Sequence, residues 1–208
     1  MLSDILQVRG TPASGKSTLA KLLGKHIGDR EPLVHVIWIS GWKFDDVEAS
    51  GGWYPYLKKR KFWEEGKDTV FIFDEAQVSY TDGALWNDLF KSIRQYRDRR
   101  AIVFASYGSP SSIINIRGTL IFVADEARVT LLPIDNGDNL PAVGLFFTRT
   151  EFDELVSTQY SSPEYHFHPS FLNAVFGLTE GHAGAICDVL EIILGYDVCA
   201  FVLREVAI

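Results

Sequence analysis

The sequence predicts an α/β fold, in which helices cover a parallel sheet and a small helical subdomain follows at the carboxyl end. Strand-like apolar runs alternate with helical patterns through the first two thirds of the 208 residues. A glycine-rich motif lies between the first expected strand and the first expected helix. From about residue 150 the pattern changes to helices alone. These observations divide the chain into an α/β core, residues 1–149, and a helical lid, residues 150–208.

The expected strands are short apolar runs bounded by polar or turn-forming residues, and strands of this kind are buried on both faces of a parallel sheet. Ligands of such sheets bind at the carboxyl ends of the strands, so functional residues should follow directly after each strand. The runs cover residues 5–8, 33–39, 69–73 and 101–106, with a later one at 143–147.

Two helices of the core are predicted from apolar side chains that recur every three or four residues. The lid should contain three helices, separated by a Ser-Ser-Pro turn and a Thr-Glu-Gly-His turn. The apolar faces in the core are Leu19, Leu22, Leu23 and Ile27, and then Leu85, Leu89, Ile93 and Tyr96. The lid helices are expected over residues 151–160, 169–178 and 181–194.

Composition limits the classes of partner. The net charge is −7, from 20 Lys and Arg against 27 Asp and Glu, which argues against extensive binding to nucleic-acid backbones. The two cysteines, Cys187 and Cys199, indicate neither a disulfide framework nor a zinc site. No apolar run approaches the roughly 20 residues that span a bilayer. We therefore expect a soluble intracellular protein, cytoplasmic or nuclear, that does not insert into membranes.

Residues 10–17 read Gly-Thr-Pro-Ala-Ser-Gly-Lys-Ser, which fits the P-loop pattern G-x-x-x-x-G-K-[ST] in its required strand-to-helix context. Backbone N–H groups of such a loop and the helix N-terminus hold phosphates. Lys16 should bridge the β- and γ-phosphates, and the Ser17 hydroxyl should ligate Mg²⁺. The predicted nucleotide-binding residues are Gly10, Thr11, Pro12, Ala13, Ser14, Gly15, Lys16, Ser17 and Thr18.

The expected strand at 69–73 ends in Asp74 and Glu75. A carboxylate buried at a strand end needs a cationic partner, and nucleotide-bound Mg²⁺ supplies one to Asp74. Glu75 would then point to the γ-phosphate, where it can orient and deprotonate the attacking water. Gln77 is a candidate partner of the γ-phosphate or of Glu75.

Ser106 ends the strand at 101–106 and is the candidate contact of the γ-phosphate on the neighbouring strand, with Tyr107 second.

The base of the nucleotide is predicted by exclusion. Guanine-specific P-loop proteins use Asn-Lys-x-Asp, whose carboxylate accepts hydrogen bonds from guanine. This tetrapeptide does not occur in the sequence, so ATP is favoured over GTP.

With its P-loop, the Asp74-Glu75 pair and Ala105-Ser106 in this order, the chain resembles P-loop ATPases of the additional-strand, catalytic-glutamate class, which includes the AAA-like and STAND-like ATPases. The phrases at 9–18, 73–80 and 105–110 look like the ATPase domain of fungal and oomycete Crinkler-type effector proteins. The class implies a three-layer P-loop NTPase fold with a sheet ordered 5-1-4-3-2 and a helical lid whose sensor residue closes over the nucleotide. That sensor would fall at His182, in a turn that lacks the usual lid arginine.

These features predict an ATP hydrolase that acts as a switch or motor core coupled to a partner. Glu75, Lys16 and Ser106 would be its catalytic residues, ATP and Mg²⁺ its cofactors, and Ser17 and Asp74 the metal-binding residues. A further protein of unknown identity, or other copies of the chain in a nucleotide-dependent oligomer, would be its partner. Two alternatives stay open: a nucleotide-dependent binding or regulatory module without hydrolysis, and a P-loop kinase.

Overall fold

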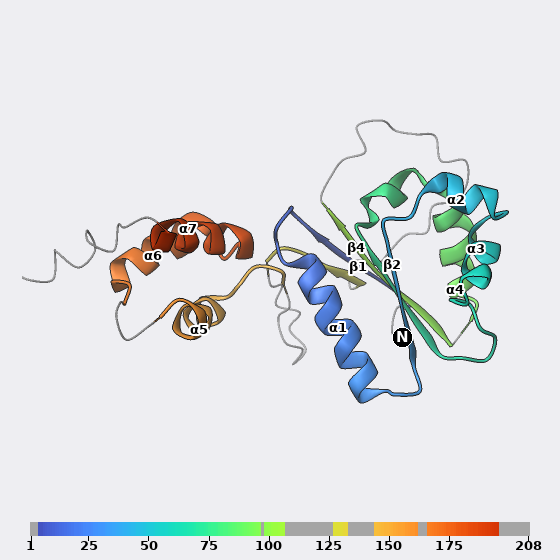
Figure 1. The fold of residues 1–208 in the computed structure, drawn as a ribbon, viewed down its shortest axis with the longest axis horizontal. Coiled ribbons are helices and arrows are strands. Elements are labelled where there is room, and N and C mark those ends of the chain that lie inside the picture. Colours follow the sequence, from blue (N-terminus) through green and yellow to red (C-terminus); the bar gives the residue numbers. More distant parts are fainter. Residues whose placement is uncertain (1–3, 97, 107–126, 133–143, 162–165, 196–208) are drawn as a thin grey trace, which may run out of the picture. The chain divides into compact units, whose positions relative to one another are not determined.

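The computed structural model describes residues 4–96, 98–106, 127–132, 144–161 and 166–195 (Figure 1). The chain forms two compact units. The first comprises residues 1–12 and 16–130, and the second comprises residues 13–15 and 131–208. Each unit is described by itself.

The first unit is built on a five-stranded sheet in the order β2-β3-β4-β1-β5. All its strand pairs are parallel. This confirms the expected fold class and the order 5-1-4-3-2, and the first four expected strands are present. The strands are β1 (Ile5–Gly10), β2 (His35–Ser40), β3 (Thr69–Asp74), β4 (Arg99–Ser106) and β5 (Arg128–Val129).

The register of the strands aligns their carboxyl ends. Gly10 at the end of β1 is level with Ser106 at the end of β4. Ser40 at the end of β2 is level with Asp74 at the end of β3. Every residue of β3 is buried, which places this strand in the interior of the unit. The last residues of these four strands therefore lie at the same edge of the sheet.

Helix α1 (Lys16–Arg30) follows β1 and covers one face of the sheet. A Cβ atom at Gly24 would lie 3.2 Å from Ile72 Cδ1, so this glycine lets the helix approach β3 closely. Ala20, one turn earlier, is fully buried, whereas Leu22 exposes 61% of its surface. The expected apolar face was therefore wrong at Leu22, because small side chains rather than leucines set the closest helix-to-sheet contact.

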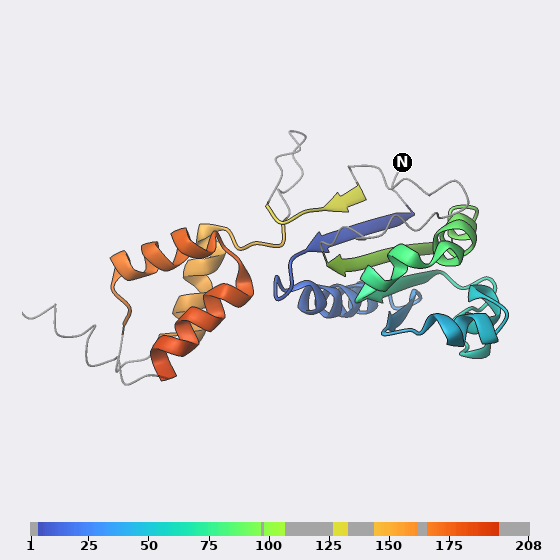
Figure 2. The same ribbon diagram turned by 90° about the horizontal axis from the view of Figure 1, so that it is seen from above.

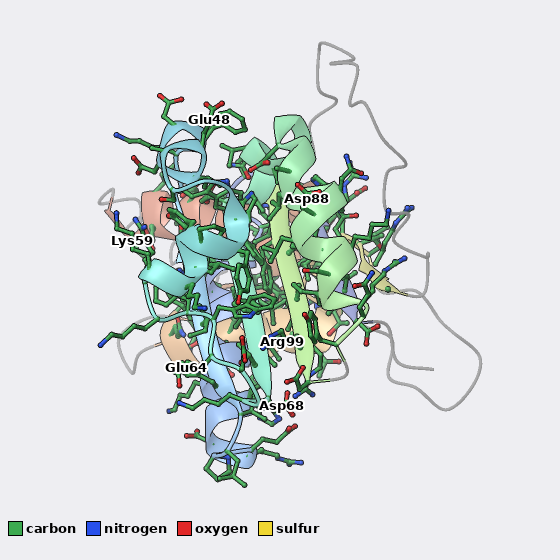
Figure 3. All side chains as sticks on the ribbon, turned by 90° about the vertical axis from the view of Figure 1, so that its right-hand side faces the viewer. Glu48, Lys59, Glu64, Asp68, Asp88 and Arg99 are labelled. Carbon is green, nitrogen blue, oxygen red and sulfur yellow. The ribbon has the colours of Figure 1, made fainter. Side chains whose placement is uncertain are left out.

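The opposite face is covered by a layer of short helices rich in aromatic side chains (Figure 1; Figure 3 looks onto this layer). Trp53 packs edge-to-face on Trp42 and on Phe73 of β3, with ring centroids 5.5 and 5.9 Å apart. The buried Asp82 accepts hydrogen bonds from Trp53 Nε1 and from Leu85 N, both at 2.9 Å. The layer consists of α2 (Phe44–Ala49), α3 (Trp53–Lys59), the 3-10 turn η1 (Ala76–Thr81), the π-helix η2 (Leu85–Phe90) and α4 (Lys91–Ile93).

The second unit contains the three helices expected in the lid: α5 (Arg149–Gln159), α6 (Pro169–Thr179) and α7 (Ala183–Gly195), which are distinct in Figure 2. Thr148 and Glu151 form a capping box at the start of α5. Each helix contributes to one apolar core. None of the helices in the described ranges combines the length and apolarity needed to cross a bilayer. The fully or nearly buried members of this core are Phe152, Val156, Tyr160, Val175, Ile186 and Leu190.

The strand expected over residues 143–147 is not formed at residues 144–147, the part of it that the structure describes. The fifth strand is instead β5, at Arg128–Val129. The apolar run has another use: Phe147 packs on the core of the second unit, and its N–H donates to Gly181 O at 2.8 Å. Burial against helices therefore explains the hydrophobicity that suggested a strand.

The backbone conformation of this turn requires glycine at position 181. Its φ is +84°, and a Cβ atom there would lie 2.2 Å from Phe147 O. We expect Gly181→Ala to lower the free energy of unfolding of the second unit by about 2 kcal/mol or more, because a positive φ and a backbone overlap are both imposed. Gly177→Ala is the control, since a Cβ atom in this exposed part of α6 meets nothing within 4 Å. It should be neutral or slightly stabilising. Thermal unfolding followed by circular dichroism measures both, and equal melting temperatures would contradict the assignment.

Candidate functional site

The carboxyl edge of the sheet brings together residues from three strands of the first unit. β1 leads through Gly10 into the P-loop, β3 ends in Asp74, and β4 ends in Ser106. Because Gly10 and Ser106 are level in the sheet, the P-loop starts beside the end of β4. β3 lies on the other side of β4. Residues far apart in the sequence thus meet where ligands of parallel sheets bind.

The P-loop turns through two residues in the left-handed region, Ala13 with φ +58° and Gly15 with φ +85°. Glycine adopts this conformation without steric cost, whereas alanine does so rarely, so the turn at Ala13 is strained. The loop then enters α1 at Lys16, and a helix of this length presents unpaired N–H groups and partial positive charge at its start. Of the loop side chains, Ser14 is buried, Pro12 and Thr18 are exposed, and Thr11 is half-buried.

Lys16 Nζ donates a hydrogen bond to Thr11 O at 2.6 Å, so the lysine spans its own loop. The residue exposes only 7% of its surface. Burial lowers the pKa of Lys16 from its ordinary value of 10.5, and the carboxylates of Glu75 and Asp74 partly offset that shift. An ammonium held in a partly desolvated site interacts strongly with any anion that enters it.

Asp74 and Ser17 are in direct contact: Ser17 Oγ donates to Asp74 Oδ1 at 3.2 Å. The same oxygen accepts from Glu75 N at 3.0 Å, and Asp74 exposes 5% of its surface. A hydroxyl and a buried carboxylate side by side are the oxygen donors that Mg²⁺ prefers, and a cation would compensate the desolvated charge. The donor set therefore fits a magnesium ion.

Glu75 directly follows β3 in the left-handed conformation, with φ +54°, and its side chain is exposed. Gln77 Nε2 donates to Glu75 Oε2 at 2.6 Å. The other amide atom of the same side chain, Oε1, accepts from Ser106 N at 3.3 Å. The sequence suggested the first contact as one option for Gln77, but not the second, because no pattern signals a bond from a side chain to a backbone N–H 29 residues away.

His182 lies in the second unit, at the start of α7. Its Nδ1 accepts from Ala185 N at 3.2 Å, which caps the helix, and its ring packs edge-on to Phe146 with centroids 5.1 Å apart. These contacts are structural, and the expected contact with nucleotide stays a prediction. Tyr107, the second candidate after Ser106, lies outside the described residues.

Comparison with known proteins gives the fold. No family model matches the chain, and no curated protein matches its sequence. AMPPCP-bound DnaA from Aquifex aeolicus is similar over 99% of this chain and 59% of its own, with 14% identity and a TM-score of 0.50. PCH-2 from C. elegans is similar over 93% of this chain and 55% of its own, with 13% identity and a TM-score of 0.47. The chain thus spans just over half the length of either protein. At such an identity the likeness to DnaA shows a shared α/β fold and nothing finer.

The lowered pKa of Lys16 predicts a pH dependence. Because the folded chain has the lower pKa, the unfolded chain binds more protons between that value and 10.5. The stability of the wild type should therefore rise with pH across this window, relative to Lys16→Met, which has no ammonium. Urea unfolding without nucleotide, followed by circular dichroism at neutral pH and at about pH 10, measures the difference. Lys21→Met, at an exposed position of the same helix, should show no such trend. The prediction would be contradicted if the free energy of unfolding of the wild type minus that of Lys16→Met stayed constant or fell as the pH rose.

Proposed function

We propose that this protein binds Mg-ATP at the P-loop and hydrolyses it, acting as a switch or motor core for a partner. The observation that carries the proposal is the meeting of Lys16, Ser17, Asp74 and Glu75 at one edge of the sheet. Ser17 touches Asp74 directly, and both carboxylates act on the pKa of Lys16. A cation, a metal-binding pair and a carboxylate that can act as a base are the parts that phosphoanhydride hydrolysis needs.

Phosphate binding would use the main chain first. The backbone N–H groups of residues 13–17, which follow Pro12 and include the start of α1, would surround the β-phosphate, and Lys16 would exchange its bond to Thr11 O for phosphate oxygens. The AMPPCP in the DnaA structure is an ATP analogue, which supports an adenine nucleotide for a chain with the same fold. The missing Asn-Lys-x-Asp tetrapeptide supports the same choice.

Ser17 and Asp74 would hold the magnesium ion, whose chemistry is to neutralise charge on the phosphates. Glu75 would accept a proton from water as the water oxygen bonds to the γ-phosphorus. The bond from that phosphorus to the bridging oxygen then breaks, and ADP and phosphate leave. Ser106, whose backbone is already level with the start of the P-loop, would contact the γ-phosphate and respond to its loss.

The helical lid at residues 150–208, with His182 as its nucleotide contact, would pass the change to the partner, either another protein or a further copy of the chain. This part of the proposal is supported by the class resemblance and by the compactness of the second unit. The shared fold does not identify the partner, because one fold serves many functions.

Release of phosphate by wild type, Lys16→Ala and Glu75→Gln tests the proposal. We expect Lys16→Ala to weaken ATP binding at least about tenfold, because it loses a charged hydrogen-bond donor to phosphate. Glu75→Gln should keep ATP affinity within about twofold and lower turnover at least about 100-fold, because the substitution removes only the group that accepts the proton from water. Glu65→Gln, at an exposed glutamate away from the P-loop, is the matched control and should behave as wild type.

Two results would overturn parts of the proposal. Tight ATP binding without phosphate release, with or without added partners, would leave a nucleotide-dependent binding module. Equal affinity for ATP and ADP would remove the switch as well, because a ligand pair with equal affinities cannot shift a conformational equilibrium.

A further inference from the structure

The side-chain amide of Gln77 joins two parts of the candidate site. Gln77 lies in η1, the 3-10 turn that follows Glu75. One end of its amide donates to Glu75 Oε2 at 2.6 Å, and the other end accepts from Ser106 N at 3.3 Å. The proposed base and the end of β4 are thus linked through one side chain.

The chemistry of the two contacts fixes which way the amide points. Ser106 N belongs to the backbone and can only donate, so the amide atom facing it must be the oxygen. The amide nitrogen must then face Glu75, whose ionised carboxylate can only accept. A reversed amide would place donor against donor at Ser106 and acceptor against acceptor at Glu75. The two contacts therefore support each other.

Glu75 needs such a partner because its own position gives it little restraint. It is exposed, so no packing selects its rotamer, and holding a glutamate in one rotamer costs conformational entropy. The bond from Gln77 to Glu75 Oε2 therefore restricts where this carboxylate can lie at the end of β3.

We infer that Gln77 is a positioning residue that orients Glu75 toward the attacking water and ties that orientation to the backbone at Ser106. The inference rests on the proposed hydrolysis and extends it. A shift of the β4 terminus when γ-phosphate is lost would move the amide oxygen and so redirect the base. Gln77 would act through Glu75 and need not touch the nucleotide.

Turnover of Gln77→Ala is the first test. We expect kcat to fall at least about tenfold, because a misplaced base loses its geometry, while ATP affinity stays within about twofold. Gln77→Glu has the same shape but sets a carboxylate against Glu75, so its kcat should fall at least as far. Val78→Ala, at the next residue of the same turn, is the control and should match the wild type. Wild-type kcat in both Gln77 variants would overturn the inference.

A double-mutant cycle separates positioning from a structural role. In the Glu75→Gln background, single-turnover rates should show no further loss from Gln77→Ala, because the group that Gln77 orients is no longer a base. A loss of the same factor in both backgrounds would mean that Gln77 only stabilises the turn, and would overturn the inference.

A measurement that does not depend on turnover completes the test. Without nucleotide, Glu75→Ala should shift the Gln77 side-chain amide resonances in ¹⁵N spectra, which are assigned by their loss in Gln77→Ala, and leave those of Gln159 in α5 unchanged. If the wild type does not hydrolyse ATP and the resonances shift, the proposed function fails and the link between Gln77 and Glu75 stands. If the resonances do not shift, the inference is overturned whatever the activity.

Discussion

The buried carboxylate of Asp74 is the group on which the rest of the site depends. It stands at the end of a strand whose residues are all buried, where an unpaired charge would be costly. Its Oδ1 is held by Ser17 from the start of α1 and by the backbone of Glu75. The same interactions therefore stabilise the charge, fix the start of α1 relative to β3, and set the direction in which Glu75 leaves the strand.

The aromatic layer packs on the face of the sheet opposite α1 and stabilises the end of β3, where Asp74 lies. Phe73, the residue before Asp74, is fully buried between Trp42, Trp53 and Phe90, with edge-to-face ring contacts. Side chains of this size leave few alternative packings, so the end of β3 is rigid. Near the site, exposed side chains such as Glu75 keep conformational freedom. A single hydrogen bond from Gln77 can therefore decide the orientation of the Glu75 carboxylate.

Much of the fold was predictable because buried parallel strands are apolar throughout and P-loop residues have a fixed spacing. β5 was not, since Arg128–Val129 is too short to form an apolar run. The burial of Leu22 was mispredicted because the periodic pattern considers apolar side chains only. In the structure α1 approaches the sheet at Gly24, which has no side chain. The motifs indicated Ser17 and Asp74 as metal-binding residues, but not the direct hydrogen bond between them. The bridge from Gln77 to Ser106 could not be predicted either, because it depends on the register of β4 and on the turn after Glu75.

The placement of the tryptophans has an optical consequence. The chain has five, at positions 38, 42, 53, 63 and 86, and all belong to the first unit. Trp42 and Trp53 contact Phe73, one residue from Asp74. Intrinsic tryptophan emission therefore reports on the sheet and its aromatic layer, whereas the second unit carries none of these fluorophores and is seen only in signals from its helices. Fluorescence follows the first unit alone and far-ultraviolet dichroism follows the helices of both units, so a difference between the two signals in a single unlabelled sample would report on the second unit.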